Sequence, residues 1–205
     1  MNLKEKFINL IRKFSQDESL SMLFWNEIES AYSSKGRFYH HLLHLENMIS
    51  ELENVKTNIN NWDEILFIVY YHDIIYSSVS KNNEEKSADF AIKKLKQLSI
   101  SQPFIDKVYQ GILATKKHEF SEDSDINYLL DADLSILGKD WEIYSEYIKN
   151  IRKEYAIYPD FLYNPGRKKV LKHFLEFKNI FKTQYFQEKY ENQARENILK
   201  EMNLL

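Results

Sequence analysis

The dipeptide His72-Asp73 ends a strongly apolar segment, residues 65–71, and is the part of this sequence best suited to chemistry. Burying an imidazole and an adjacent carboxylate costs free energy unless a hydrogen bond, an opposite charge or a metal ion compensates them. Further histidines and acids stand upstream and downstream, at His40, His44, His118 and Asp133. The sequence therefore indicates a metal site with nitrogen and oxygen ligands.

The chain contains no cysteine, which excludes thiolate ligands, disulfides and cysteine nucleophiles together. Imidazoles combined with carboxylates suit an octahedral Mn, Fe, Co, Ni or Mg ion that keeps open coordination positions. Such an ion polarises a phosphoryl oxygen and lowers the pKa of bound water, which generates hydroxide at neutral pH. Hydrolysis of a phosphoester is the reaction that this set of residue types favours.

In chain order, His40, His72-Asp73 and Asp133 resemble the H…HD…D signature of the HD-domain superfamily. The match extends over residues 37–138, because the apolar lead into His72-Asp73 and the residues around Asp133 fit as well. More narrowly, nearly the whole chain resembles a family of predicted metal-dependent HD-superfamily phosphohydrolases. The motifs that carry this resemblance are Tyr39-His40…His44, Tyr71-His72-Asp73, Asn83-Glu84…Ser87-Ala88, Thr115…His118, Asp131-Ala132-Asp133-Leu134, Ile151-Arg152…Glu154-Tyr155 and Gly166-Arg167.

The resemblance implies an all-helical domain in which four residues hold one divalent ion, with open positions for water and a phosphate oxygen. These ligands would be His40, His72, Asp73 and Asp133. The implied activity is metal-dependent hydrolysis of a nucleotide or another small phosphoester, with Asp73 helping to orient the attacking water. Two alternatives stay open: a di-iron HD-type oxygenase with a second ion, and a non-catalytic module that binds metal or ligand.

Several residues around this set have candidate catalytic roles. His40 and His44 lie four residues apart, so they would share one helical face and either could ligate the ion. The spacing from Arg37 to His40 matches the HD pattern and favours His40, which leaves His44 to a second ion, the substrate or support of the ligands. Glu84 could position water or donate a proton, and His118 could contact a second ion or phosphate, although both also suit a helix end.

A phosphate substrate needs cations, and arginine fits best because its guanidinium donates two parallel hydrogen bonds. The candidates are Arg37, Lys116, Lys117, Arg152 and Arg167. Arg152 and Arg167 are preferred because both belong to motifs of the resembled family. Asp131 stands two residues before Asp133 and would point to the other side of a helix, which indicates a supporting or capping role.

The elements that must position these residues are all predicted to be helices. Glycine and proline are scarce and aromatic residues reach 15%, which favours a helical body with a bulky core. Apolar spacing predicts helices over 7–14, 20–36, 38–52, 61–76, 82–95, 101–118, 123–137, 144–155 and 167–181, followed by an amphipathic tail. Asn82 and Glu85 predict a capping box, and Asn164-Pro165-Gly166 predicts a turn.

No segment resembles a linker, a repeat or a low-complexity tract. The sequence therefore predicts one all-α, HD-type domain over residues 1–205, with helices of 139–205 packed on the motif region. A net charge of −3 excludes a global field that would hold nucleic acid or an anionic membrane. No stretch resembles a signal peptide or a membrane span, so we expect a cytoplasmic protein, monomeric or homo-oligomeric, with a small phosphorylated substrate.

Overall fold

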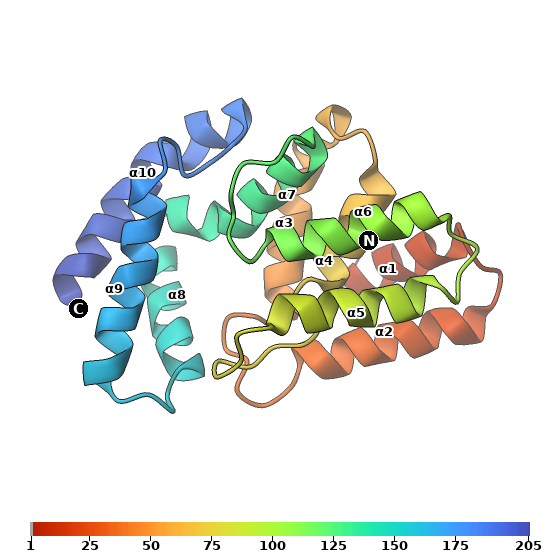
Figure 1. The fold of residues 1–205 in the computed structure, drawn as a ribbon, viewed down its shortest axis with the longest axis horizontal. Coiled ribbons are helices and arrows are strands. Elements are labelled where there is room, and N and C mark those ends of the chain that lie inside the picture. Colours follow the sequence, from red (N-terminus) through yellow and green to blue (C-terminus); the bar gives the residue numbers. More distant parts are fainter. Residues whose placement is uncertain (1) are drawn as a thin grey trace.

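The computed structural model describes residues 2–205, and this part of the chain contains ten α-helices, two short 3₁₀ helices and no strand (Figure 1). The α-helices are α1 (Leu3–Arg12), α2 (Glu18–Tyr32), α3 (Leu42–Glu53), α4 (Trp62–Tyr71), α5 (Asn83–Leu95), α6 (Gln102–Ala114), α7 (Ser124–Leu134), α8 (Trp141–Glu154), α9 (Asp160–Glu176) and α10 (Gln184–Leu204). The 3₁₀ helices are η1 (Lys56–Asn58) and η2 (Ser135–Gly138). The predicted all-α fold class is confirmed.

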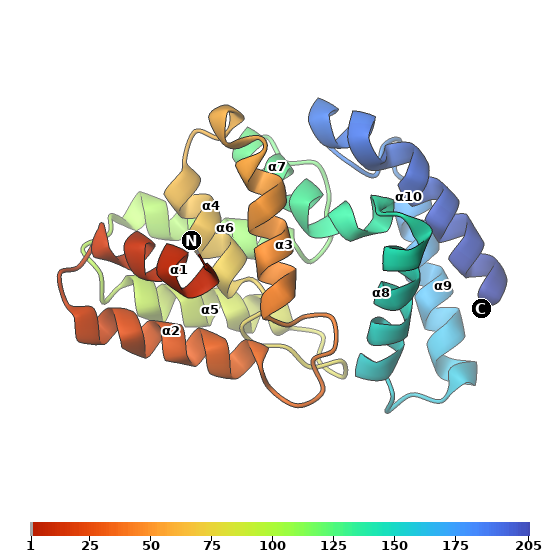
Figure 2. The same ribbon diagram turned by 180° about the vertical axis from the view of Figure 1, so that it is seen from behind.

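Helix α4 is the central element, and every residue from Ile65 to Tyr71 is buried. It packs against α3, α5, α6 and α7, so it needs apolar side chains on all its faces. Helices α8, α9 and α10 form a separate layer, which η2 joins to the rest (Figures 1 and 2). Among the helices of residues 2–205, none combines the length and apolarity that a bilayer crossing requires.

The predicted helix over 38–52 begins too early. Helix α3 starts at Leu42, and the His41 imidazole caps it by accepting a hydrogen bond from the backbone of Leu43. His40 therefore precedes the helix and does not share a helical face with His44. The cause is a tertiary contact, because the backbone N–H groups of residues 38–40 donate to the carboxylate of Glu154 in α8.

Two other local predictions are also wrong. Asn82 is the N-cap of α5 but makes no capping bond, because its side-chain oxygen accepts from Ser80 instead. Asn164-Pro165-Gly166 is not a turn but lies inside α9, even though proline lacks the N–H that a helix interior uses. Packing outweighs this local cost: Leu171 is buried and Asn164 donates to the carbonyl of Leu205 at 3.3 Å.

Gly138, the last residue of η2, lies where α10 crosses most closely. A β-carbon at Gly138 would stand 2.8 Å from the backbone oxygen of Tyr190, which cannot move as a flexible side chain would. We expect Gly138→Ala to lower the free energy of unfolding by about 2 kcal/mol in urea titrations. Gly166→Ala is the matched control, because a β-carbon there meets nothing within 4 Å, and should be neutral or stabilising. Equal unfolding midpoints for the two variants would contradict this close packing.

Candidate functional site

Three of the predicted residues converge from three helices. His44 lies in α3, His72 directly follows α4, and Asp133 lies at the end of α7. Each offers a ligand atom within 4.8 Å of the other two. His44 Nε2 stands 3.4 Å from His72 Nε2 and 3.2 Å from Asp133 Oδ1. The fold thus forms a buried group that could hold a metal ion.

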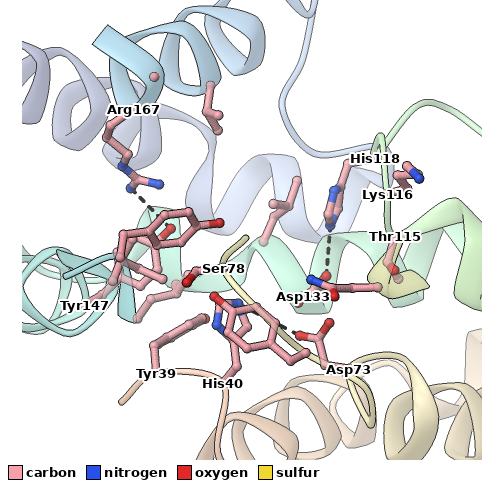
Figure 3. A pocket seen from close by; sticks show the side chains of 18 of the residues that line it. Tyr39, His40, Asp73, Ser78, Thr115, Lys116, His118, Asp133, Tyr147 and Arg167 are labelled. Carbon is pink, nitrogen blue, oxygen red and sulfur yellow. Dashed lines mark hydrogen bonds and ion pairs between the residues drawn. The ribbon is translucent and has the colours of Figure 1, made fainter. Parts of the chain in front are cut away.

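Three more predicted residues surround this group. Asp73 Oδ2 lies 3.4 Å from His72 Nε2 and 3.9 Å from His40 Nε2. On the other side, His118 Nε2 lies 2.8 Å from Asp133 Oδ2 (Figure 3). Asp133 therefore links His44 and His118 through its two oxygens. Four histidines and two carboxylates form one continuous set.

The charges at this point favour a cation. Burial lowers the pKa of His44, which leaves its imidazole neutral with a lone pair to share. Burial also opposes a charge on His72, but the carboxylates of Asp73 and Asp133 outweigh burial and raise its pKa to about 9. Burial alone would raise the pKa of Asp133, yet hydrogen bonds from His118 and His44 hold it well below its ordinary value. The buried carboxylates require positive charge, and imidazole and carboxylate donors fit a divalent ion.

Glu154, the last residue of α8, organises the segment that carries His40. Its Oε1 accepts the backbone N–H groups of Phe38, Tyr39 and His40 at 2.8, 2.7 and 2.9 Å. Its Oε2 lies 2.6 Å from His40 Nδ1 and accepts from the Tyr76 hydroxyl at 2.8 Å. This arrangement directs His40 Nε2 toward Asp73. Sequence reasoning missed this role, for which the resembled motif around Arg152 and Glu154 was the available signal.

The choice between His40 and His44 as a ligand of the ion remains a prediction. The compact group contains His44, which is held by Asp133 and His72. His40 is anchored through Nδ1 and keeps Nε2 on the side of Asp73, so it stands next to the group. Both imidazoles can therefore serve a site with one or two ions.

His118 adopts an unfavourable backbone conformation. It is the one non-glycine residue of 2–205 with a positive φ, 52°, and it follows the last turn of α6. Glycine is the usual residue at such a position, because a β-carbon in the left-handed region costs about 1 kcal/mol. The strained residue carries the imidazole that bonds Asp133, which favours a functional reason for histidine here.

Substitution of His118 separates backbone strain from the role of the imidazole. His118→Gly and His118→Ala both remove the contact with Asp133, but only glycine relieves the positive φ. We expect the glycine variant to be more stable than the alanine variant by about 1 kcal/mol in urea unfolding. Calorimetric titration with Mn²⁺ should show the same weakened binding in both. An alanine variant at least as stable as the glycine variant would contradict the strain.

His72 and Asp133 of the buried group line a cavity of about 600 Å³, whose lining does not include His44. Eight predicted site residues line it, namely His40, His72, Asp73, Glu84, Lys116, His118, Asp133 and Arg167. Lys116 lies beside Glu84, at 3.8 Å between Nζ and Oε2, and also pairs with Glu85. Arg167 comes from α9, where its Nε donates to Glu201 Oε1 at 2.7 Å. Cavities of this size accommodate small organic ligands.

The structure does not bring Arg37 or Arg152 to this cavity. The Arg37 guanidinium donates to the carbonyls of His40 and Ile74, at 3.1 and 3.0 Å. Arg152 bonds the carboxylate of Asp160 and two backbone carbonyls beyond the end of α8. Both side chains therefore hold loops, and their contact with phosphate stays a prediction.

Asp131 has the supporting role that its position suggested. Its carboxylate accepts the backbone N–H groups of Lys182 and Thr183, each at 2.7 Å, in the segment before α10. It thereby ties α7 to the C-terminal layer and does not belong to the metal-capable group.

Comparison with known proteins gives no assignment, because no family model, curated protein or solved structure matches this chain. The resemblance to the HD superfamily therefore rests on the sequence motifs, and the function has to be argued from the site.

Proposed function

We propose that this chain is a cytoplasmic, metal-dependent phosphohydrolase of the HD type, acting on a nucleotide or another small phosphoester. One observation carries the proposal: His44 of α3, His72 at the end of α4 and Asp133 of α7 meet, and His72 and Asp133 line a cavity. Asp73, His40 and His118 stand around them within contact distance. This donor set and the adjacent space support hydrolysis at a metal centre.

His72, Asp73 and Asp133, with His44 or His40, would hold the ion. A bound divalent ion supplies a Lewis acid and makes its coordinated water more acidic. Asp73 lines the cavity and can accept a hydrogen bond from the attacking water. Lys116 can neutralise a phosphate oxygen at the same end, and the neighbouring Glu84 can deliver a proton to the leaving oxygen.

Metal analysis of the purified protein, combined with a phosphatase and phosphodiesterase panel in Mn, Mg, Co, Ni and Fe(II), tests the proposal. We expect a divalent ion near one per chain and phosphate release, both lost in His72→Ala and Asp73→Ala. His173→Ala is the control, because this histidine lies on the exposed side of α9 away from the cavity. Activity that survives both site substitutions would overturn the proposed hydrolase.

A second candidate is a di-iron oxygenase, favoured by the two-sided contacts of Asp133. Its Oδ1 contacts His44 and its Oδ2 contacts His118, so the residues on both sides of this carboxylate would be able to hold an ion. Two irons per chain, a mixed-valence spectroscopic signal and oxygen consumption would support this candidate. One redox-inert ion together with phosphate release would eliminate it.

A further inference from the structure

The lining of the cavity is rich in tyrosine. Six of the 14 tyrosines of the chain line this one cavity: Tyr39, Tyr76, Tyr147, Tyr155, Tyr158 and Tyr163. Tyr39 and Tyr76 lie against His40, with ring centroids 4.9 and 4.4 Å from its ring, and the other four belong to α8, α9 and the segment between them. Figure 3 shows Tyr147 and Arg167 at one side of the cavity, with His118 and Lys116 at the other. The cavity thus has a polar end and an aromatic end.

The tyrosine rings of this end contact one another and two arginines, because the guanidinium carbons of Arg167 and Arg152 lie 5.3 and 4.7 Å from the ring centroids of Tyr147 and Tyr163. The centroids of Tyr39 and Tyr147 lie 4.6 Å apart in an edge-to-face arrangement, and those of Tyr155 and Tyr163 lie 6.0 Å apart. Aliphatic side chains such as Ile151 continue the same wall. A planar aromatic group gains binding energy from stacking on such a wall, whereas a sugar or a short alkyl chain gains much less.

Arg167 adds one polar contact to this aromatic end. Its Nε and Nη2 donate to the carboxylate of Glu201, and Nη2 also donates to the Tyr147 hydroxyl at 3.2 Å. The third nitrogen, Nη1, donates to no group in residues 2–205, on a side chain that lines the cavity. Two N–H groups are therefore available to an acceptor atom on the far edge of a ligand.

The charges of the cavity limit the number of phosphates. Three carboxylates line it, those of Asp73, Glu84 and Asp133, against the cations of Lys116 and Arg167. With neutral histidines and a divalent ion, the lining would carry one net positive charge, and Glu201 behind Arg167 reduces even that. Glu85 is likewise paired with Lys116, so the positive charge of the lining does not exceed the negative charge of one phosphate group. A triphosphate would bring more negative charge than the cavity neutralises.

We infer that the substrate is a phosphomonoester of an alcohol that carries an aromatic ring, of about mononucleotide size, and that polyphosphates are disfavoured. The inference rests on the proposed phosphohydrolase function. The phosphate lies at the polar end, the ring stacks against Tyr147 and its neighbours, and an acceptor on the ring bonds Arg167 Nη1. Hydrolysis breaks the phosphorus–oxygen bond, so that water supplies the new oxygen of inorganic phosphate and the alcohol leaves with a proton.

Steady-state phosphate release from adenosine 5′-monophosphate, glycerol 3-phosphate and adenosine 5′-triphosphate tests this selectivity. We expect the monophosphate to exceed the other two in kcat/KM by about tenfold or more. Tyr147→Leu should raise KM for the monophosphate about tenfold and change the value for glycerol 3-phosphate less than about twofold. Tyr147→Phe keeps the ring and is the matched control. Tyr155→Leu provides a second ring deletion if Tyr147→Leu fails to fold.

Calorimetric binding of adenosine to the metal-free protein separates this inference from the proposed function. Adenosine binding that Tyr147→Leu weakens, without phosphate release from any probe, would support the aromatic end and overturn the hydrolase. Phosphate release at equal rates from all three probes, unchanged by either ring deletion, would overturn the aromatic selectivity and leave the hydrolase standing. Preferred hydrolysis of the triphosphate would overturn the charge argument.

Discussion

Asp133→Ala is expected to abolish metal binding and to lower kcat/KM for any phosphoester substrate by about a thousandfold or more. The substitution removes one of the three members of the compact group and leaves His44 and His118 without their shared carboxylate, which now lies 3.2 and 2.8 Å away. It also removes half of the buried negative charge that favours a cation beside His72. Calorimetric titration with Mn²⁺ and metal analysis measure the first effect, and phosphate release measures the second.

Asp131→Ala is the matched control for this result. The two residues belong to the same helix, but Asp131 bonds the backbone of Lys182 and Thr183 instead of the histidines. Its loss should lower the free energy of unfolding by about 2 to 3 kcal/mol while the folded protein keeps its metal stoichiometry. An Asp133→Ala variant that binds Mn²⁺ like the unaltered protein would contradict the assignment of the site.

The polar end of the site was largely predictable from the sequence because local patterns determine its elements. The apolar run over 65–71 indicates a buried helix in a chain of this composition, and the structure has this helix, which places His72 in the interior. Helix α7 begins where the sequence predicts, after Asp123, and this start fixes the helical positions of Asp131 and Asp133. Helix α6, which leads to His118, also begins near the predicted residue 101, with Pro103 in its first turn.

The position of His40, the course of α9 and the tyrosine lining of the cavity depend on contacts between residues far apart in sequence, which a local pattern does not contain. His40 leaves the predicted helix because Glu154, 114 positions later, accepts its backbone N–H. The buried pair of Arg167 with Glu201 joins α9 to α10 and helps to continue the helix through Pro165, where local preference predicts a turn. The tyrosine wall has the same origin, because its members come from three separate segments of the chain.

Glu154→Gln is expected to lower both stability and activity, and its effect on stability should depend on pH. Burial alone would raise the pKa of the Glu154 carboxyl, but the contact with His40 and the backbone N–H groups lower it to about 2. Because the folded state binds this proton only at lower pH than the unfolded chain does, the carboxylate stabilises the fold fully above about pH 4.5, and this contribution is lost as the pH falls toward 2. The full contribution of this carboxylate to the free energy of unfolding is on the order of 3 kcal/mol, because its pKa falls from 4.5 to about 2 on folding.

Urea unfolding of the unaltered protein and Glu154→Gln, at pH 7 and at pH 3, measures this contribution. The variant should be clearly less stable at pH 7, and the difference should shrink at pH 3, because roughly half of the contribution of the native carboxylate is lost by then. Activity at pH 7 should fall about tenfold to a hundredfold, since His40 loses the partner that orients its ring. Glu146→Gln, an exposed residue of the same helix, is the control and should change neither quantity. A stability difference of equal size at both pH values would show that Glu154 acts by packing alone, without the charge that orders residues 38–40.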